Sequence, residues 1–409
     1  MRKFLLLAFR NVFRNRRRTV MTLLVVSGGV AGLLLVGGFF SFMFWGLRES
    51  TIRNGLGHLQ IYNAEYFRHD EAHALDNGLD DYQGVTALAA RNRHVRGVTA
   101  RIEFYGMLSN GLKSAVFLGT GVDPGKEKSM GFEPTVTAGR YLDANAADAN
   151  QALLGAGLAR SMGARPGDSL TLLSVTSDGA LNGIDIDVTG IVTTGFKEMD
   201  DRLLTIPLAS AQRLLQSKRV TKLVVGLDKT ENTDAVYAAI LPALGAWHQQ
   251  LAVRKWIDLA GYYKQVRLMM SGIFVFLGVI VFFMVVMSSA NTMMMAMFER
   301  TREIGTMLAM GTPRSWLMGL FVGEAVFTGA LAAALGVAAG TGLGALLNRS
   351  GLVMPPPPGT TAGLPLRVIH EPALMAGAAV LVLITLAAAS LMPAVRASRL
   401  RIVEALSHV

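Results

Sequence analysis

The sequence contains no cysteine and carries little charge for its length. None of its 409 residues is Cys, and Asp, Glu, Lys and Arg together account for 17%. The missing cysteine excludes a disulfide framework and a thiolate metal site, and it leaves the redox compartment undetermined. The hydrophobic share of 51% is too high for an ordinary soluble domain of this length. The composition therefore indicates a membrane protein.

Motifs for nucleotide binding and hydrolysis are also missing. Gly125-Lys126 is followed by Glu127 and lacks the upstream glycine of the Gly-x-x-x-x-Gly-Lys-Ser/Thr loop that cradles ATP phosphates. The Gly-x-Ser-x-Gly turn of a serine nucleophile is absent too. His69 and His73 are open to two interpretations, a metal pair or a solvated polar turn, and no third ligand is evident. We therefore expect no enzyme activity, no cofactor and no metal.

Four long apolar segments predict membrane-spanning helices, at residues 19–47, 268–290, 317–347 and 373–392. The first apolar run, Val20–Leu47, has 28 residues. A signal-peptide core has only about 7–15. A helix of that length would be about 42 Å long, against about 30 Å for the hydrocarbon core of a bilayer. We therefore expect a retained first span whose outer end projects from the membrane as a stalk.

Residues 48–267, between the first two spans, predict a large α+β extracytoplasmic domain. Its strand-like runs are 115–118, 169–173, 184–188 and 222–226, and its helix-like runs are 85–91, 151–162, 208–216 and 233–244. A break near residues 139–150 leaves open a division into two lobes. Apolar residues at helical spacing over 256–266 predict a second stalk helix that leads into the second span.

The net positive charge of the chain lies on one side of this arrangement. Segment 1–18, predicted to be a basic amphipathic helix on the lipid surface, loop 291–316 and tail 393–409 together hold 13 Lys and Arg against three Glu. Domain 48–267 holds 24 Lys and Arg against 24 Asp and Glu. The positive-inside rule therefore places both termini in the cytoplasm, and residues 348–372 form an extracytoplasmic loop. Anionic lipid headgroups account for the basic character, so we expect no nucleic-acid partner.

Two features inside the third predicted span bear on its function. Gly336, Gly340 and Gly344 recur every four residues. This spacing favours close helix packing over a flexible glycine-rich helix with no fixed partner. Glu324 is costly in lipid, and two interpretations stay open: a functional site, or a buried hydrogen-bonding group that fixes helix packing.

The most informative stretch lies in the loop between the second and third spans. It reads Glu-Arg-Thr-Arg-Glu-Ile-Gly-Thr-Met-Leu-Ala-Met-Gly over residues 299–311. As a helix, it places Glu299 one turn from Arg302, within pairing distance, and gathers its apolar residues in a narrow stripe before Gly311 ends it. The pattern predicts an amphipathic helix on the membrane surface that offers a face to another protein. A solvated charged loop is the alternative.

These residues resemble the signature of a known family. Glu299-Arg-Thr-Arg-Glu-Ile-Gly-x-x-x-Ala-x-Gly311, followed directly by an apolar span, is similar to the FtsX-like permease domain. That domain is the membrane subunit of ATP-driven transporters of the MacB and LolC/LolE class. The stretch Pro393-Ala-Val-Arg-Ala-Ser-Arg-Leu-Arg-Ile-Val-Glu-Ala-Leu406 resembles the tail of the same domain. Residues 163–171 resemble a turn of the family's periplasmic domain, and Gly121-Val-Asp-Pro-Gly125 resembles a turn of its lipoprotein-releasing branch more closely than of its macrolide-exporter branch.

The resemblance implies a four-span α-helical permease of the bacterial inner membrane with a MacB-like periplasmic core domain. It implies that the charged segment is a coupling helix that docks on a separate ABC ATPase. The implied docking residues are Glu299, Arg300, Thr301, Arg302, Glu303, Ile304, Gly305, Ala309 and Gly311. The other implied partners are a second permease copy or paralogue, membrane lipids, and a periplasmic chaperone or adaptor.

The mechanism that the resemblance implies is mechanotransmission. Closure of the ATPase dimer would push the coupling helix, tilt the first two spans and reshape the periplasmic domain. The expected substrate is a lipoprotein or similar lipidated molecule, taken from the outer leaflet of the inner membrane. Two alternatives stay open: a non-transporting regulator that relays ATPase motion to a periplasmic hydrolase, and an exporter of small molecules or peptides.

Overall fold

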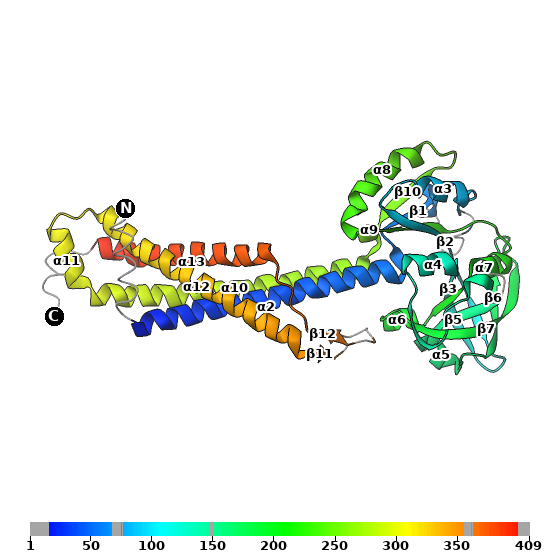
Figure 1. Ribbon diagram of the computed structural model, residues 1–409, viewed down its shortest axis with the longest axis horizontal. Helices are drawn as coiled ribbons and strands as arrows, with labels where there is room; N and C mark the ends of the chain where they lie inside the picture. Colours follow the sequence, from blue (N-terminus) through cyan, green and yellow to red (C-terminus); the bar gives the residue numbers. More distant parts are fainter. Residues whose placement is uncertain are drawn as a thin grey trace. The chain divides into compact units, whose positions relative to one another are not determined.

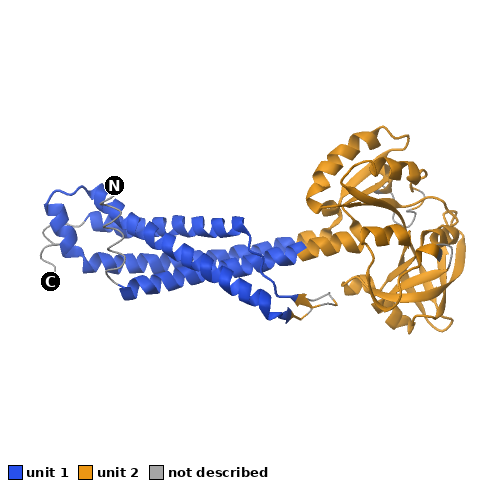
Figure 2. Ribbon diagram, in the orientation of Figure 1, with its two compact units in different colours: residues 1–45, 266–353, 365–409 blue, residues 46–265, 354–364 orange. Residues whose placement is uncertain are grey.

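The structure is a computed structural model that describes residues 16–67, 75, 77–146, 150–355, 361 and 363–399. The chain divides into two compact units, which Figure 2 distinguishes by colour. One contains residues 1–45, 266–353 and 365–409, and the other contains residues 46–265 and 354–364. Most of the predicted N-terminal helix 1–18, the pair His69 and His73, and residues 400–409 of the predicted tail lie outside the described residues.

Four helices in the described residues are long and apolar enough to cross a membrane. They are α2 (Arg16–Thr51), α10 (Gly261–Glu299), α12 (Arg314–Ser350) and α13 (Pro372–Ser398), as Figure 1 shows. Each predicted span lies inside one of them. The helices are longer than the predicted spans because hydropathy marks only the apolar middle of a helix, whereas backbone hydrogen bonding continues through its polar ends.

A shared apolar core joins these four helices within the membrane unit. Its buried members are Val26, Val30 and Leu34 of α2, Val285 of α10, Ala332 of α12, and Ala378, Val382 and Leu386 of α13. The α2 residues recur every four positions, so one side of that helix faces the other three. All four long helices therefore contribute buried side chains to one apolar core.

The second unit is built on a ten-stranded mixed sheet in the order β10-β1-β9-β2-β3-β8-β5-β7-β4, with β6 paired to β2 and β7. The strands are β1 (Leu59–Asn63), β2 (Val95–Ser109), β3 (Ser114–Val122), β4 (Thr135–Gly139), β5 (Gln151–Gly155), β6 (Ser169–Val175), β7 (Leu181–Thr193), β8 (Leu203–Pro207), β9 (Lys222–Leu227) and β10 (Leu251–Lys255). Among the pairings of described residues in this sheet, only β3–β8 and β5–β7 are parallel. Antiparallel pairing dominates, as expected of an α+β domain.

Short helices cover this sheet. They are α3 (Tyr82–Ala89), α4 (Pro124–Met130), α5 (Ala156–Met162), α6 (Lys197–Asp200), α7 (Leu208–Leu215), α8 (Thr233–Gly245) and α9 (Trp256–Leu259). Ile102, Phe104 and Phe117 are buried in the largest core, to which α3, α5, α7 and α8 contribute side chains. Met130 of α4 packs instead against Val224, whose neighbours Leu223 and Val225 belong to the largest core, so this part of the sheet is covered on both faces.

The chain enters and leaves this domain on neighbouring strands. After α2, the turn Ile52–Leu56 leads into β1, which pairs antiparallel with β10. The predicted stalk helix 256–266 is interrupted at Ala260, whose ψ of 66° is not helical. A straight helix would separate Trp256 from Tyr263 by about 10 Å along its axis. The break instead brings their rings edge to face, 5.2 Å apart, in an apolar cluster with Ile52.

Most predicted elements of the domain are confirmed, and two predictions are wrong. The four predicted strands lie in β3, β6, β7 and β9, and three predicted helices overlap α3, α7 and α8. The predicted helix 151–162 is half wrong, because Gln151–Gly155 is strand β5 between β7 and β8. Its fully buried Ala-Leu-Leu run has no alternation to distinguish a central strand from a helix. The division near 139–150 is also wrong, since β4 and β5 both pair with β7 in one sheet.

A buried ion pair holds the entry of the chain against the sheet. Arg101 on β2 donates two hydrogen bonds of 2.8 Å to the two carboxylate oxygens of Glu127 on α4. Both side chains are buried, at 8% and 2% exposure. Arg101 also donates to the backbone carbonyl of Gly55 in the turn after α2. Burial alone would lower the pKa of Arg101, but the carboxylate of Glu127 outweighs it, so this pKa is raised.

Glu127→Gln should destabilise the domain strongly. Removing one charge leaves Arg101 buried without its counterion, which costs about 3–5 kcal/mol of unfolding free energy. Trp247 and Trp256 lie in this domain, so a Trp45→Phe/Trp316→Phe background leaves them as the only tryptophan reporters of its thermal unfolding. Asp234→Asn, which breaks the exposed pair with Lys255, is the control and should leave the midpoint unchanged. Equal midpoints for the two variants would show that the buried pair does not hold the domain.

Candidate functional site

The predicted coupling segment contains a short helix of its own, α11 (Thr301–Ala309), between α10 and α12. The prediction of one helix over 299–311 is wrong at its start, because α10 ends at Glu299 and Arg300 has a non-helical ψ of 12°. The Thr301 hydroxyl donates to the carbonyls of Met297, at 3.1 Å, and Phe298, at 2.9 Å, and so satisfies the end of α10. Gly311, with φ of +87°, follows the end of α11.

One face of α11 packs into the membrane unit. Thr301, Ile304 and Gly305 are buried, and Met307 and Leu308 are partly buried. Ile304 belongs to an apolar cluster whose other buried members are Met293 and Met297 of α10, Leu317, Phe321 and Ala325 of α12, and Ala394 and Ala397 of α13. Helix α11 is therefore attached to three of the four long helices through this face, at one end of the bundle (Figure 1).

The opposite face of α11 is exposed. Its exposed residues are Arg302, Glu303, Thr306 and Ala309, followed by Met310 and Gly311. The Met310 side chain, at 79% exposure, is among the most exposed large apolar residues in the described part of the chain. The nine residues predicted to dock therefore do not share one surface: Arg302, Glu303, Ala309 and Gly311 are exposed, whereas Thr301, Ile304 and Gly305 are buried.

Arg300 points away from that exposed face. Its Nη1 lies 3.1 Å from Oε1 of Glu324 on α12, and the two side chains are only 15% and 8% exposed. A lone carboxylate at such a position would be costly, and the guanidinium compensates its charge. Under both interpretations of Glu324, the contact that the structure shows is this ion pair, which joins the junction before α11 to α12.

Glu299 contacts a different span. Its carboxylate accepts from the Arg18 guanidinium of α2, with side-chain exposures of 51% and 19%. The predicted pairing of Glu299 with Arg302 is wrong, because the break at Arg300 removes the helical register that would bring them together. Thr22 and Thr292 also hydrogen-bond between α2 and α10, at 2.9 Å. The consecutive residues Glu299 and Arg300 thus connect the junction to α2 and α12.

Sequence reasoning missed the role of Arg18, which it counted only among the lipid-facing basic residues of segment 1–18. Its partner lies 281 positions away. No local pattern signals such a contact, because it depends on how α2 and α10 pack.

The predicted glycine face of α12 makes two kinds of contact. A Cβ on Gly336 would lie 2.6 Å from Cβ of Val30, and one on Gly340 would lie 3.2 Å from Cβ of Leu34, so both glycines lie against α2. A Cβ on Gly344 would instead lie 2.9 Å from Nε2 of His370, in the segment before α13. The absence of a side chain at all three positions is what permits these approaches.

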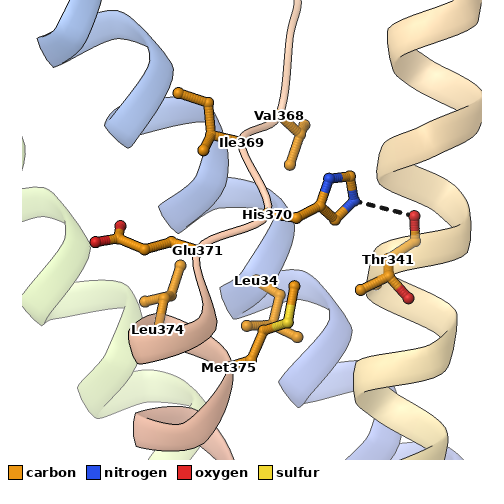
Figure 3. Close-up of a pocket in the computed structure, with 9 residues that line it drawn as sticks. Leu34, Thr341, Val368, Ile369, His370, Glu371, Leu374 and Met375 are labelled. Atoms are coloured by element: carbon orange, nitrogen blue, oxygen red, sulfur yellow. Dashed lines mark hydrogen bonds between the residues drawn. The ribbon is translucent and has the colours of Figure 1, made fainter.

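A small cavity of about 10 Å³ lies beside this face (Figure 3). Its lining includes Leu34, Thr341 and the segment from Val368 to Met375. His370 Nε2 lies 3.1 Å from the Thr341 carbonyl oxygen, and Ser41 donates to Glu371 at 3.2 Å. A space of this size holds at most one water molecule, so it is no substrate site. The described residues also contain no group of three or more potential metal ligands.

Two family models match the chain. One describes a MacB-like periplasmic core domain and matches residues 19–243, and the other describes an FtsX-like permease C-terminal domain and matches residues 273–402. The FtsX-like match includes α11, Glu324 and the glycine face of α12.

Curated relatives and solved structures are also similar. The chain is 24% identical over 284 residues to the lipoprotein-releasing system transmembrane protein LolC of Neisseria meningitidis, covering 68% of each chain. It is 23% identical over 281 residues to LolE of Haemophilus influenzae, covering 65% of each. The periplasmic region of MacB from Actinobacillus actinomycetemcomitans aligns with 14% identity and a TM-score of 0.38, over 52% of this chain and 95% of that one. The extracellular domain of the transporter YknZ from Gram-positive bacteria aligns with 12% identity and a TM-score of 0.35, over 49% and 100%.

Gly340→Leu should weaken the packing of α12 against α2. The new side chain would collide with Leu34 and Ala31, and overpacking of this kind costs about 1–3 kcal/mol. The measurement is the thermal midpoint of the full chain in detergent. Gly342→Leu is the matched control on the same helix, since nothing lies within 4 Å of its Cβ position. Equal loss in both variants would show that helix flexibility, rather than the α2 contact, requires glycine.

Proposed function

From the premise that this chain belongs to the FtsX-like permease family and carries a MacB-like periplasmic core domain, we propose that it relays the motion of a separate ABC ATPase to its extracytoplasmic domain. The chain is a permease component of an ABC transporter and an inner-membrane protein. The observation that carries the proposal is the two-sided character of α11. Its buried face packs against the long helices, and its opposite face is exposed.

The composition of the exposed face fits a protein partner. Arg302 and Glu303, in the first turn of α11, supply charges of both signs, and Met310 supplies an exposed, adaptable apolar side chain at the other end of the helix. Interfaces commonly combine an apolar centre with a charged rim. We therefore assign docking to Arg302, Glu303, Thr306, Ala309 and Met310, and not to the buried residues of the same motif.

Two continuous helices supply a route from the membrane to the extracytoplasmic domain. Helix α2 leads through the turn Ile52–Leu56 into β1, and β10 leads through α9 into α10. Because β1 and β10 pair residue by residue, from Leu59 with Lys255 to Asn63 with Leu251, a tilt of either helix would act on the same edge of the sheet. This arrangement supports mechanotransmission, in which the domain changes shape while nothing passes through a membrane channel.

A lipoprotein or a similar lipidated molecule is the substrate we propose. The support is the likeness to two transmembrane proteins of lipoprotein-releasing systems. The motif Gly121-Val-Asp-Pro-Gly125, which resembles that branch, has a structural role: the Asp123 carboxylate accepts from the backbone N–H groups of Gly125 and Lys126 and caps α4. The motif therefore supports a relation to the lipoprotein-releasing branch, and the role we assign to it is capping α4 rather than contacting substrate.

The extracytoplasmic sheet offers a surface that suits apolar contact. Exposed apolar side chains face each other across β2 and β3 as the pairs Tyr105 with Leu118 and Met107 with Val116. An antiparallel sheet usually turns polar side chains toward water. Contiguous exposed apolar groups mark interaction surfaces, which fits a lipidated substrate or an extracytoplasmic partner protein.

The proposal includes an orientation, with α11 and both termini in the cytoplasm and the sheet domain in the periplasm. The chain has no native cysteine, so single cysteines at exposed positions report on topology. Ser129→Cys should react with an impermeant thiol reagent in intact spheroplasts, and Thr306→Cys only after lysis. Thr301 is unsuitable as a probe because its side chain is buried. The reverse labelling pattern would overturn the orientation.

Glu303→Lys should weaken association with the ATPase by about tenfold or more, equivalent to about 1.4 kcal/mol. The side chain is exposed, so the fold should survive the charge reversal. The measurement is the amount of ABC ATPase that co-purifies with the tagged chain from native membranes, together with the hydrolysis rate of that complex. Asp234→Lys, which reverses an exposed charge in the extracytoplasmic domain, is the control and should change neither quantity. Wild-type association of Glu303→Lys would favour a solvated loop over a docking helix.

A further inference from the structure

We propose that Arg300 and Glu324 are positioning residues whose ion pair makes α12 follow the movement of α11. The inference rests on the proposed docking of an ATPase on α11, and it separates residues that the family signature places in one continuous motif. On this view Arg302 and Glu303 bind the ATPase, whereas Arg300 passes the resulting displacement inward.

The local backbone makes such a role feasible. Arg300 is the single non-helical residue between α10 and α11, so it lies where a displacement of α11 first reaches the rest of the chain. Its guanidinium reaches across to α12 and meets Glu324 Oε1 at 3.1 Å. A side-chain link at the junction between two rigid helices transmits displacement more directly than the flexible side chains of the exposed face.

The apolar surroundings of the pair make its separation costly. Glu324 lies on α12 between the buried apolar residues Phe321 and Ala325 of the neighbouring cluster. A charged carboxylate there requires its partner to stay close, because separating buried opposite charges is costly. Apolar contacts, in contrast, slide with little loss. The ion pair is therefore the contact that resists separation of α11 from α12.

The other ion pair of the junction provides an internal comparison. Arg18 and Glu299 link the same junction to α2, but Glu299 is half exposed. An exposed pair is screened by water and contributes less. We therefore expect Glu299→Gln to have a smaller effect on coupling than Glu324→Gln, although the two substitutions are chemically identical.

The test measures movement between α2 and α12. Spin labels on cysteines introduced at Trp45 and Leu346, both exposed, report the distance between these helices in the complex with its ATPase. The distance is compared without nucleotide and after trapping with ATP and vanadate. The full chain is used, and its lack of native cysteine keeps the labelling specific.

In Glu324→Gln, we expect ATPase co-purification to be unchanged and most of the nucleotide-dependent distance shift to be lost. The charge exchange Arg300→Glu/Glu324→Arg should recover most of the shift. The apolar double variant Arg300→Met/Glu324→Leu should fold stably, since it removes both charges of the pair and leaves neither of them buried without the other. Its nucleotide-dependent distance shift should nevertheless be as small as that of Glu324→Gln.

The outcomes separate this inference from the proposed function. If the wild-type complex shows no distance shift, or Glu303→Lys binds the ATPase normally, the proposed function fails. If the wild-type shift is present and the folded apolar double variant retains it, the pair serves only packing and the inference is overturned. The apolar double variant decides the question even where Glu324→Gln does not fold.

Discussion

The arrangement of the membrane unit depends on the ion pair between Arg300 and Glu324. Few side chains are less suited to a lipid-facing helix than Glu324, and on α12 it is buried with a guanidinium from the α10–α11 junction as an ion-pair partner. Arg300, which supplies this guanidinium, also forms the break between α10 and α11. The break in turn directs one face of α11 into the apolar cluster around Ile304 and leaves the other face exposed. The exposed face of α11, to which we assign docking, thus begins beside the residue that compensates a charge inside the bundle.

The extracytoplasmic domain meets a comparable constraint at its own entrance. Arg101 and Glu127 are buried together, and Arg101 also binds the backbone carbonyl of Gly55, where the chain leaves α2. The neighbouring strands β1 and β10 receive the chain from α2 and return it toward α10. Both units therefore use a buried arginine–glutamate pair beside the point where a long helix ends. Such pairs would keep the long helices in contact with their neighbours during the movement that we propose.

Much of this architecture could be predicted from the sequence, because its determinants are local. The four long helices follow from apolar length, and strands such as β3 and β9 follow from their residue patterns. The exposed positions of α11 follow from helical spacing. The ion pairs at the α10–α11 junction were not predictable in the same way. Arg18 meets Glu299, and Arg300 meets Glu324, only after helices distant in sequence pack together. Strand β5 was mistaken for a helix because a fully buried apolar run carries no periodicity.

The central claim is that the exposed face of α11 binds a separate ATPase, and photocrosslinking tests it most directly. A photoreactive amino acid would replace Met310, the exposed apolar residue at the C-terminal end of α11, in the full chain in native membranes. A control chain would carry the same group at Met293, on the buried side of the cluster. The account predicts an adduct between position 310 and an ABC ATPase subunit, identified by mass spectrometry, and no such adduct from position 293. Adducts from position 310 to lipid alone would contradict it.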